Sequence, residues 1–494
     1  MYHHFDCCEA ILAGLRRAFT RQATFDWFSV FVVGQMCRED DLGVSAVVRC
    51  LGLEPQAYDS LNALFRSDGW SASALVGEWE RIVAESAPLL EYLGRPVGVA
   101  DGVKAAREGV RTPGVKRLTQ TSSDSSKADK IFGLMYGAVG VLAGEPGRCH
   151  CLPLEVGVQD GMRAAAGWDG AAELGIASET HPVQSVRCSF RAARALGRPS
   201  WLTMDRYFMC EPALTLLGEL NAQAEADGLG EGFVQLVTKA RSGCVGFTDP
   251  PEREPGRPGR PKVRGDKVDV FSLFDTAPFD LVLAEVGGEP RAYDACVVDL
   301  LWREGFYFPL RFVLVVDEHG KREVLATTDR TLTAAQVITL YRFRWNCEVS
   351  YRDMKQDVNA FGCRMWSKAM PALNRFYKRA DPDRLESVTD AHDRQLILSA
   401  YEAMSRYVAA CCVVTGILQL LSLAEPEDGP VAWSEYRRTP SRGKVSVRTV
   451  RRCMRRRVSS WVACHQTSPT ARFIRERLVG PGGYDPAIQR RGRR

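Results

Sequence analysis

The sequence predicts an α/β fold in which a mixed sheet is flanked by helices. The main observation is the order of elements at residues 95–245, which reads as three strands, a helix, a strand, a helix and a strand. Short strands at residues 268–327 predict a mostly β insertion. Helical patterns at residues 1–94 and 371–436 predict helical regions on both sides of the sheet.

Composition and charge limit the classes to which the protein can belong. The chain has 494 residues, of which 45% are apolar and 25% charged, an ordinary globular composition for several domains. Its net charge is only +5, but residues 437–494 contain 17 Lys and Arg against two acidic residues. A basic segment on an otherwise acidic chain indicates a polyanionic partner. The alternative is a disordered tail that only keeps the protein in solution.

Cysteine usage and hydropathy indicate the compartment. The 16 cysteines form no paired framework, which favours free thiols in a reducing cytoplasm. Cys149-His150-Cys151 has no second Cys/His pair at zinc-knuckle spacing, so structural thiols are favoured over a metal site. Residues 1–17 lack the apolar segment of a signal peptide. Residues 408–424 are apolar but interrupted by polar side chains, and predict a buried helix; no membrane partner is expected.

The N-terminal region, residues 1–94, is predicted to be a helical domain that contacts DNA. Residues 45–51 and 56–66, joined by a turn, have the length of a helix-turn-helix. Arg49 and Arg66 could then face DNA. A plain helical bundle gives the same pattern, so that alternative stays open.

The central region, residues 95–245, contains two acidic residues that follow predicted strands. A strand at residues 96–100 is expected to end at Asp101-Gly102, and a buried strand at residues 200–204 is followed by Asp205. Open α/β sheets carry their chemistry at the carboxyl ends of strands. The other expected elements are a loop or irregular hairpin at 104–130, strands at 136–142, 152–158 and 233–238, and helices at 183–196 and 211–227.

Residues 246–327 are predicted to form a Pro- and Arg-rich loop and short strands, with a hairpin at residues 317–320. The loop contains five prolines and cannot be helical. Its cations Arg257, Arg260 and Lys262 suit a DNA minor groove. Such a segment can also be a simple linker, but a DNA-facing loop is favoured.

The most informative stretch lies within residues 328–370. Thr333 and Gln336 form a capping-box pattern, and neither Pro nor Gly interrupts residues 334–360, so one helix is predicted. At about 100° per residue, one face of that helix carries a ring, two cations and a carboxylate. These residues are Tyr341, Arg344, Glu348 and Lys355. A solvated charged face is the alternative interpretation.

Beyond residue 360 the sequence predicts an irregular segment, a long helical region and a basic helix. Residues 360–385 are expected to be irregular, and residues 394–423 to form one or two long helices within the region 371–436. Residues 448–457 predict a basic helix inside the basic C-terminal region, residues 437–494.

Asp101, Asp205 and Glu348 together have the composition of a two-metal phosphoryl-transfer site. Two Mg²⁺ ions about 3.5–4 Å apart stabilise the attacking and leaving oxygens. Mg²⁺ prefers carboxylate oxygens and keeps several waters, so three acids suffice. A single Asp after a strand is more often a cap or turn residue.

With these residues the sequence resembles the DDE transposases of bacterial insertion sequences. Tyr341-x2-Arg344-x3-Glu348-x6-Lys355 matches their YREK signature at all four positions. Ala100-Asp101-Gly102-Val103-Lys104 is similar to the first Asp motif, and Met204-Asp205-Arg206-Tyr207-Phe208 to the second. The resemblance covers roughly residues 95–370 and implies an RNase H-like core with a β insertion before the Glu. Residues 133–137 lack the His that some relatives have.

The resemblance implies a role for each matching residue. Asp101, Asp205 and Glu348 would bind two Mg²⁺ ions, which Mn²⁺ could replace. Arg344 and Lys355 would hold phosphates at the transposon end, and Tyr341 would contact a phosphate or stack near a displaced base. Weaker candidates for contacts with the DNA backbone are Lys104, Arg206 and Arg352.

The implied activity is that of a DNA endonuclease and strand transferase in the bacterial cytoplasm, at the nucleoid. A metal-activated water would hydrolyse the bond at the element end, and the freed 3′-OH would attack target DNA. The partners would be transposon-end and target DNA, with a homodimer joining the two ends. Two alternatives stay open: a transposase-derived protein that binds DNA without cutting it, and an RNase H-like nuclease without strand transfer.

Overall fold

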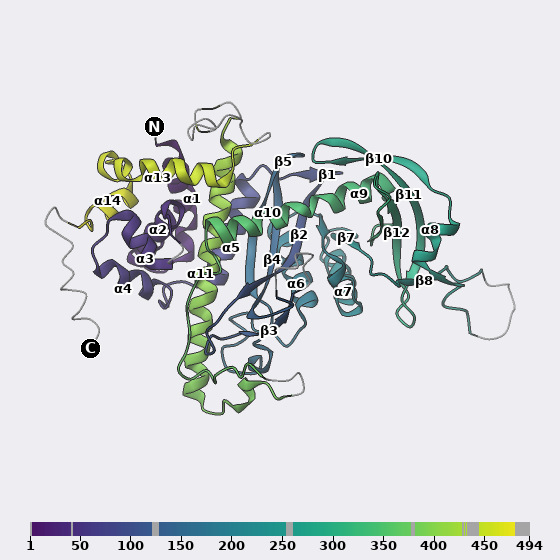
Figure 1. The fold of residues 1–494 in the computed structure, drawn as a ribbon, viewed down its shortest axis with the longest axis horizontal. Helices are drawn as coiled ribbons and strands as arrows, with labels where there is room; N and C mark the ends of the chain where they lie inside the picture. The colour runs from purple at the N-terminus through teal and green to yellow at the C-terminus, as the bar shows by residue number, and fades with distance from the viewer. Residues whose placement is uncertain are drawn as a thin grey trace.

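A mixed sheet runs through the middle of the protein, and helices cover both of its faces (Figure 1). The computed structural model describes residues 2–40, 43–120, 128–252, 260–376, 381–426, 429, 431 and 444–479. The strands are β1 Glu91–Tyr92, β2 Arg95–Ala106, β3 Lys116–Thr119, β4 Lys130–Glu145, β5 Arg148–Val158, β6 Ser200–Thr203, β7 Val234–Lys239, β8 Val245–Phe247, β9 Lys267–Asp269, β10 Asp280–Val286, β11 Glu289–Trp302, β12 Phe308–Val316 and β13 Arg322–Thr327.

The sheet combines an antiparallel part, a parallel part and an antiparallel extension. Strand β4 pairs antiparallel with both β5 and β2. Strand β2 pairs parallel with β6, and β6 parallel with β7. From β7 onward the order β13-β12-β11-β8-β9 is antiparallel, and it includes the predicted hairpin at residues 317–320. The predicted mixed sheet is confirmed.

Strand β2 is longer than predicted and includes Asp101. Its ladder with β4 continues beyond Gly102, which pairs with Gly137, so Asp101-Gly102 does not end the strand. Gly102 is required by close packing, because a Cβ there would lie 2.4 Å from the Met135 methyl and 2.8 Å from His181 Nε2. The glycine that predicted a turn is therefore a site of close approach.

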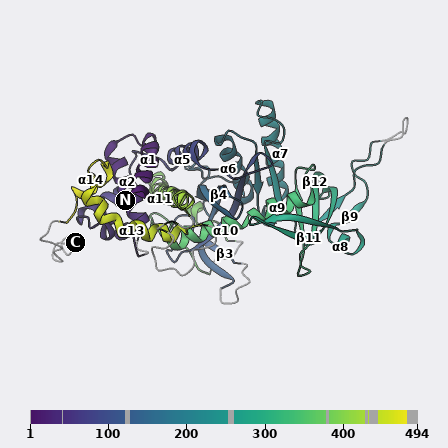
Figure 2. The same ribbon diagram turned by 90° about the horizontal axis from the view of Figure 1, so that it is seen from above.

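Helices form a layer on each side of the central strands. Helix α6, His181–Ala195, packs on β2 and β4, and α7, Glu211–Ala226, packs on α6. Helices α10, Trp345–Arg352, and α11, Ala391–Ala424, pack on β5. In Figure 2, α6 and α7 lie on one side of β4 and α10 on the other. The predicted helices at residues 183–196, 211–227 and 394–423 are thus confirmed.

Helix α11 is the buried helix predicted from its apolar stretch. Among the described residues it is long and apolar enough to cross a membrane by length and composition alone. However, 83% of its most apolar window is buried inside the protein. It lies between the sheet and the N-terminal helices (Figure 1), which makes it a core helix.

The two ends of the chain pack together on the far side of α11 (Figure 1). The N-terminal helices are α1 His3–Leu15, α2 Gln22–Cys37, α3 Gly43–Leu51, α4 Gln56–Leu64 and α5 Ala72–Ser86. The C-terminal helices are α13 Val447–Cys464, which includes the predicted basic helix, and α14 Pro469–Arg475. The rings of Phe5 and Trp461 stack with centroids 4.4 Å apart. Much of the basic region is therefore folded, whereas residues 437–443 and 480–494 lie outside the described residues.

All 16 cysteines are free thiols, as predicted. Cys149 and Cys151 are buried in β5, and the buried His150 shares a hydrogen bond of 2.9 Å with Ser422. Burial lowers the pKa of His150 well below its usual value. This run of residues is part of the core, in agreement with the structural interpretation.

Candidate active site

Asp101 and Asp205 come from two neighbouring parallel strands. Strand β2 carries Asp101, and Asp205 lies two residues after the last residue of β6, as the N-cap of a short 3₁₀ turn. Val99 of β2 pairs with Thr203 of β6, so each acid lies two residues beyond the same register position. Neighbouring strands are about 4.8 Å apart. The two acids are therefore close neighbours.

The helix that carries Glu348 begins as predicted. Thr333 is the N-cap of α9, Ala334–Phe343, and its hydroxyl accepts a hydrogen bond from the Gln336 backbone amide. The Gln336 side chain in turn accepts from the Thr333 backbone amide at 2.8 Å. The predicted capping box is confirmed.

The prediction of one regular helix from residue 334 to residue 360 is wrong. A tight turn at Arg344 separates α9 from α10. In this turn the Arg344 backbone amide donates to the Tyr341 carbonyl, three residues earlier. A π-helical turn, Asp353–Asp357, follows α10, and it contains Lys355. The wider turn changes the angle at which later side chains leave the helix. Tyr341, Arg344, Glu348 and Lys355 therefore do not share one regular face.

Arg344 joins two of the three predicted acids. Its Nη1 lies 2.8 Å from Asp101 Oδ2, and its Nη2 lies 2.7 Å from Glu348 Oε1. The Arg344 side chain is 16% exposed, and the Asp101 side chain 20%. A guanidinium fork matches carboxylate geometry and makes strong charge-assisted bonds. One largely buried cation thus connects the sheet to α10.

The charges around Asp101 place the third acid in the same cluster. Burial raises the pKa of Asp101 to about 6; Arg344 and the Gly102 amide oppose this rise, whereas Asp205 and Glu348 add to it. Burial disfavours the charged form of Arg344, but the surrounding acids outweigh burial and raise its pKa. The carboxylates of Asp205 and Glu348 can raise the pKa of Asp101 only if they lie close to it.

A cation is therefore part of the acidic cluster. Within the described ranges, no group of three or more His, Cys, Asp and Glu side chains is close enough to hold a metal ion. Arg344 instead neutralises the acids. Their oxygen-only donor set has the chemistry that Mg²⁺ prefers.

Two tyrosines support the cluster. Tyr341 is only 7% exposed, and its ring centroid lies 5.9 Å from the Arg344 guanidinium carbon. Burial is the main cause that raises the pKa of Tyr341 to about 12, and Asp205 adds to it. The buried hydroxyl of Tyr351 donates to the backbone carbonyl of Asp101 at 2.9 Å. Tyr351 was missed from the sequence, although it lies three residues after Glu348.

The other predicted DNA contacts are spread over the surface. Arg352 is exposed and 3.5 Å from Asp353, while Lys104 donates to the Thr119 carbonyl at 2.6 Å. The remaining exposed residues are Arg206, Arg260, Lys262 and Lys355. Arg257 lies outside the described residues.

A further cation near Asp205 could not be recognised from the sequence. The Arg241 guanidinium donates to the backbone carbonyls of Arg206 at 3.4 Å and Tyr207 at 3.2 Å. It fixes the turn that follows Asp205. A single Arg in a loop after β7 carries no sequence signal for this role.

Comparisons with known proteins add little to this geometry. No family model matches the sequence, and no curated protein matches it. Among solved structures, the chain is similar to a piggyBac transposase synaptic complex with hairpin DNA, with 11% sequence identity and a TM-score of 0.38. The similarity covers 99% of this chain and 88% of that chain. Likeness at this level carries no argument about function.

Proposed function

We propose that this protein is a metal-dependent DDE DNA transposase with an RNase H-like catalytic core. The observation that carries the proposal is the bridge from Arg344 to Asp101 and Glu348, at 2.8 and 2.7 Å. It joins two acids of the DDE pattern that are far apart in the sequence. Asp205 completes the triad from the strand beside Asp101. A structural ion pair needs one acid, whereas Arg344 pairs with two acids and a third lies on the neighbouring strand.

The topology supports the RNase H-like assignment. The central strands lie in the order β5-β4-β2-β6-β7, with two acids on the adjacent parallel strands β2 and β6. Strands β8 to β13 separate Asp205 from α10, which agrees with a β insertion before the third acid.

The acids suit a pair of Mg²⁺ ions. Asp101, Asp205 and Glu348 offer only carboxylate oxygens, and Glu348 is 39% exposed, so the cluster is open to solvent on its side. When bound, two Mg²⁺ ions, or Mn²⁺ in their place, would act as Lewis acids on the phosphodiester and lower the pKa of an attacking water.

The chain's own residues would bind and orient the DNA. Arg344 can release Asp101 and Glu348 and donate both arms of its guanidinium to a phosphate, since phosphate and carboxylate fit the same fork. Its exchange of partners would free the acids at the moment DNA arrives. Lys355, exposed in the π-helical turn, would contribute a second cation, and the Tyr341 hydroxyl a neutral hydrogen bond to phosphate.

The partners that follow from this function are transposon-end DNA and target DNA. Two ends must be joined, so a homodimer is the proposed working assembly, in the cytoplasm at the nucleoid. The cations Arg206, Arg260, Lys262 and Arg352 are exposed and suit contacts with the DNA backbone. Lys104, held at the Thr119 carbonyl, would have to change partner to do so.

A DNA-cleavage assay tests the proposal. The substrate is a plasmid carrying the DNA that flanks the gene, incubated with the full chain and Mg²⁺. Nicks or breaks with 3′-OH ends, followed by joining of these ends to a second DNA, are expected. Cleavage without joining would support an RNase H-like nuclease instead. Binding without cleavage in either metal would support a transposase-derived DNA-binding protein.

A further inference from the structure

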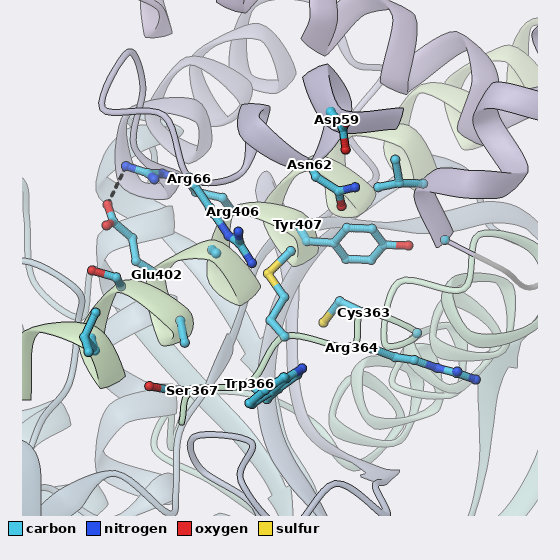
Figure 3. Close-up of a pocket in the computed structure, with 18 of the residues that line it drawn as sticks. Asp59, Asn62, Arg66, Cys363, Arg364, Trp366, Ser367, Glu402, Arg406 and Tyr407 are labelled. Carbon is cyan, nitrogen blue, oxygen red and sulfur yellow. Dashed lines mark ion pairs between the residues drawn. The ribbon is translucent and has the colours of Figure 1, made fainter. Parts of the chain in front are cut away.

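A large cavity lies between the N-terminal helices and the catalytic region, outside the acidic cluster (Figure 3). Its volume is about 970 Å³, at the upper end of the usual range for ligand pockets. One wall comes from α3 and α4, another from the segment 362–368, and a third from α11. Three parts of the chain that are distant in sequence therefore meet around it.

Exposed rings and a polar amide line this cavity. Trp366 is 55% exposed and Tyr58 is 46% exposed, which is unusual for such large side chains in a pocket. Asn62 lies on the wall opposite Trp366 (Figure 3). The cavity thus offers a flat apolar surface together with donors and acceptors.

Four cations and three acids line the cavity: Arg66, Arg364, Lys368 and Arg406, with Asp59, Asp68 and Glu402. Arg406 is buried and pairs with Glu402 at 2.6 Å, so this pair is internally neutral. Its Nε has no hydrogen-bond partner. In the described part of the chain, the exposed side chains of Arg66, Arg364 and Lys368 make no ion pair. With four cations against three acids the lining keeps a net positive charge of one, and with the exposed ring of Trp366 it suits an anion that also carries a flat ring.

The floor of the cavity is attached to the strand that carries Asp101. Arg111 donates to the carbonyls of Lys368 at 2.7 Å and Met370 at 2.8 Å, and it accepts from the Ser367 amide. Arg107, which follows β2, lies 4.0 Å from Cys363 Sγ. From Asp101 to the end of β2 is about 17 Å at 3.3 Å per residue. This length corresponds to about five nucleotides, at about 3.4 Å per nucleotide.

We propose that this cavity binds an unpaired nucleotide of the DNA on which the acids act. Its base stacks on Trp366, and the phosphates beside it contact Arg66, Arg364 and Lys368. In a duplex both faces of each base are already stacked, so the free face of Trp366 selects a base outside a duplex. The inference rests on the proposed function for the identity of the DNA, but the binding can be measured without cleavage.

The test is fluorescence anisotropy of the full chain with a labelled oligothymidylate in EDTA, beside a duplex of equal length. Trp366→Ala is expected to weaken oligothymidylate binding by about tenfold or more, while duplex binding changes by less than about twofold. Trp366→Phe should keep most of the affinity, because it keeps a stacking ring. Phe376→Ala, at a ring that is 91% exposed outside the cavity, is the matched control and should change neither.

The cations give a second, independent readout. For single strands, each lost phosphate contact lowers the slope of log K against log salt by about 0.7. Arg364→Ala should show this change for oligothymidylate. An unchanged affinity in Trp366→Ala, or an equal loss for single strand and duplex, overturns the proposal.

The cavity assignment and the proposed function can be disproved independently of each other. If the wild-type protein cuts DNA but Trp366→Ala binds oligothymidylate normally, only the cavity assignment is wrong. If Trp366→Ala loses this binding but no acid-dependent cleavage occurs, the cavity stands and the proposed function falls.

Discussion

Arg344 donates a hydrogen bond of 2.8 Å to Asp101 across 243 residues of sequence. The same guanidinium holds Glu348 at 2.7 Å. The Arg344 guanidinium thus lies between Asp101 and Glu348, two acids that would bind metal ions in the proposed reaction. Binding of DNA phosphate and binding of metal ions are therefore linked. A phosphate that draws the Arg344 guanidinium away leaves Asp101 and Glu348 free to bind metal ions.

The first prediction follows from this competition. Arg344→Gln should tighten Mn²⁺ binding without DNA by about fivefold or more, because a positive charge next to two acids is removed. It should weaken DNA binding at the same time. Electron paramagnetic resonance of free Mn²⁺ measures the first effect. Arg342→Gln is the matched control, since Arg342 pairs with Glu323 instead of the cluster. Equal Mn²⁺ affinity in wild type and Arg344→Gln would refute the competition.

The second prediction concerns the acid on α10. Glu348→Gln should lower the single-turnover rate of DNA cleavage by more than about 100-fold and leave DNA binding within about twofold, since a neutral amide is a poor Mg²⁺ ligand. Gel assays of cleavage and binding report the two effects. The exposed Glu318→Gln in the β12–β13 turn should behave as wild type. Wild-type cleavage by Glu348→Gln would remove this residue from the site.

The third prediction is a pH profile. Asp101 has a pKa of about 6, so its carboxylate is protonated below that pH and free to bind a cation above it. At low Mg²⁺ concentration, the rate of DNA cleavage should increase about tenfold for each unit of pH up to pH ~6 and level off above it. Arg344 lowers the pKa of Asp101, so Arg344→Gln should move the midpoint to higher pH. A flat profile between pH ~5 and ~7 would show that Asp101 does not limit the rate.

The fourth prediction tests Lys355 in the π-helical turn. Lys355→Ala should weaken the binding of end DNA. It should also lower the slope of log K against log salt by about 0.9, the value for one lost phosphate contact on duplex DNA. Affinity measured at several salt concentrations gives this slope. A defect that is independent of salt and of DNA concentration would exclude a phosphate contact. The exposed Lys321→Ala, in the same turn as Glu318, serves as a charge-matched control.

The fifth prediction is a stability effect outside the site. Glu80 of α5 is buried, its Oε1 has no hydrogen-bond partner, and burial raises its pKa to about 7. The folded state then binds a proton that the unfolded state releases, so unfolding becomes easier as pH rises from about 4.5 to about 7. Glu80→Gln should stabilise the protein at pH ~8 by about 1–3 kcal/mol and have little effect at pH ~4.5.

Denaturant unfolding at the two pH values measures this effect. Glu78→Gln is the control, because Glu78 pairs with Arg81 at the surface of the same helix and should change stability by less than about 0.5 kcal/mol. An equal effect of Glu80→Gln at both pH values would show that Glu80 is not protonated in the folded protein.

Local patterns predicted much of this structure. The capping box at Thr333, the long helix α11 and the strands β4 to β7 follow from periodicity and turn residues, which act over a few positions. Asp101 and Asp205 were recognised as neighbours of strands for the same reason.

Contacts between distant segments could not be predicted in this way. Gly102 predicted a turn, but its position is decided by Met135 and His181, which approach it from other elements. The turn at Arg344 and the π-helical turn after α10 depend on packing, because no Pro or Gly marks them. The bond from Arg344 to Asp101 likewise belongs to the tertiary structure, and helical spacing predicted only that Arg344 and Glu348 share a face.

The most direct test of the central claim is cleavage of the flanking DNA by purified protein with Mg²⁺, compared between wild type and Asp205→Asn. Asp205 lies outside the Arg344 bridge and contributes to the site only through the acidic cluster. Defined breaks in the flanking DNA are expected with the wild type and none with Asp205→Asn, which should still bind the DNA. Equal cleavage by both proteins, or no Mg²⁺-dependent cleavage by the wild type, would contradict the central claim.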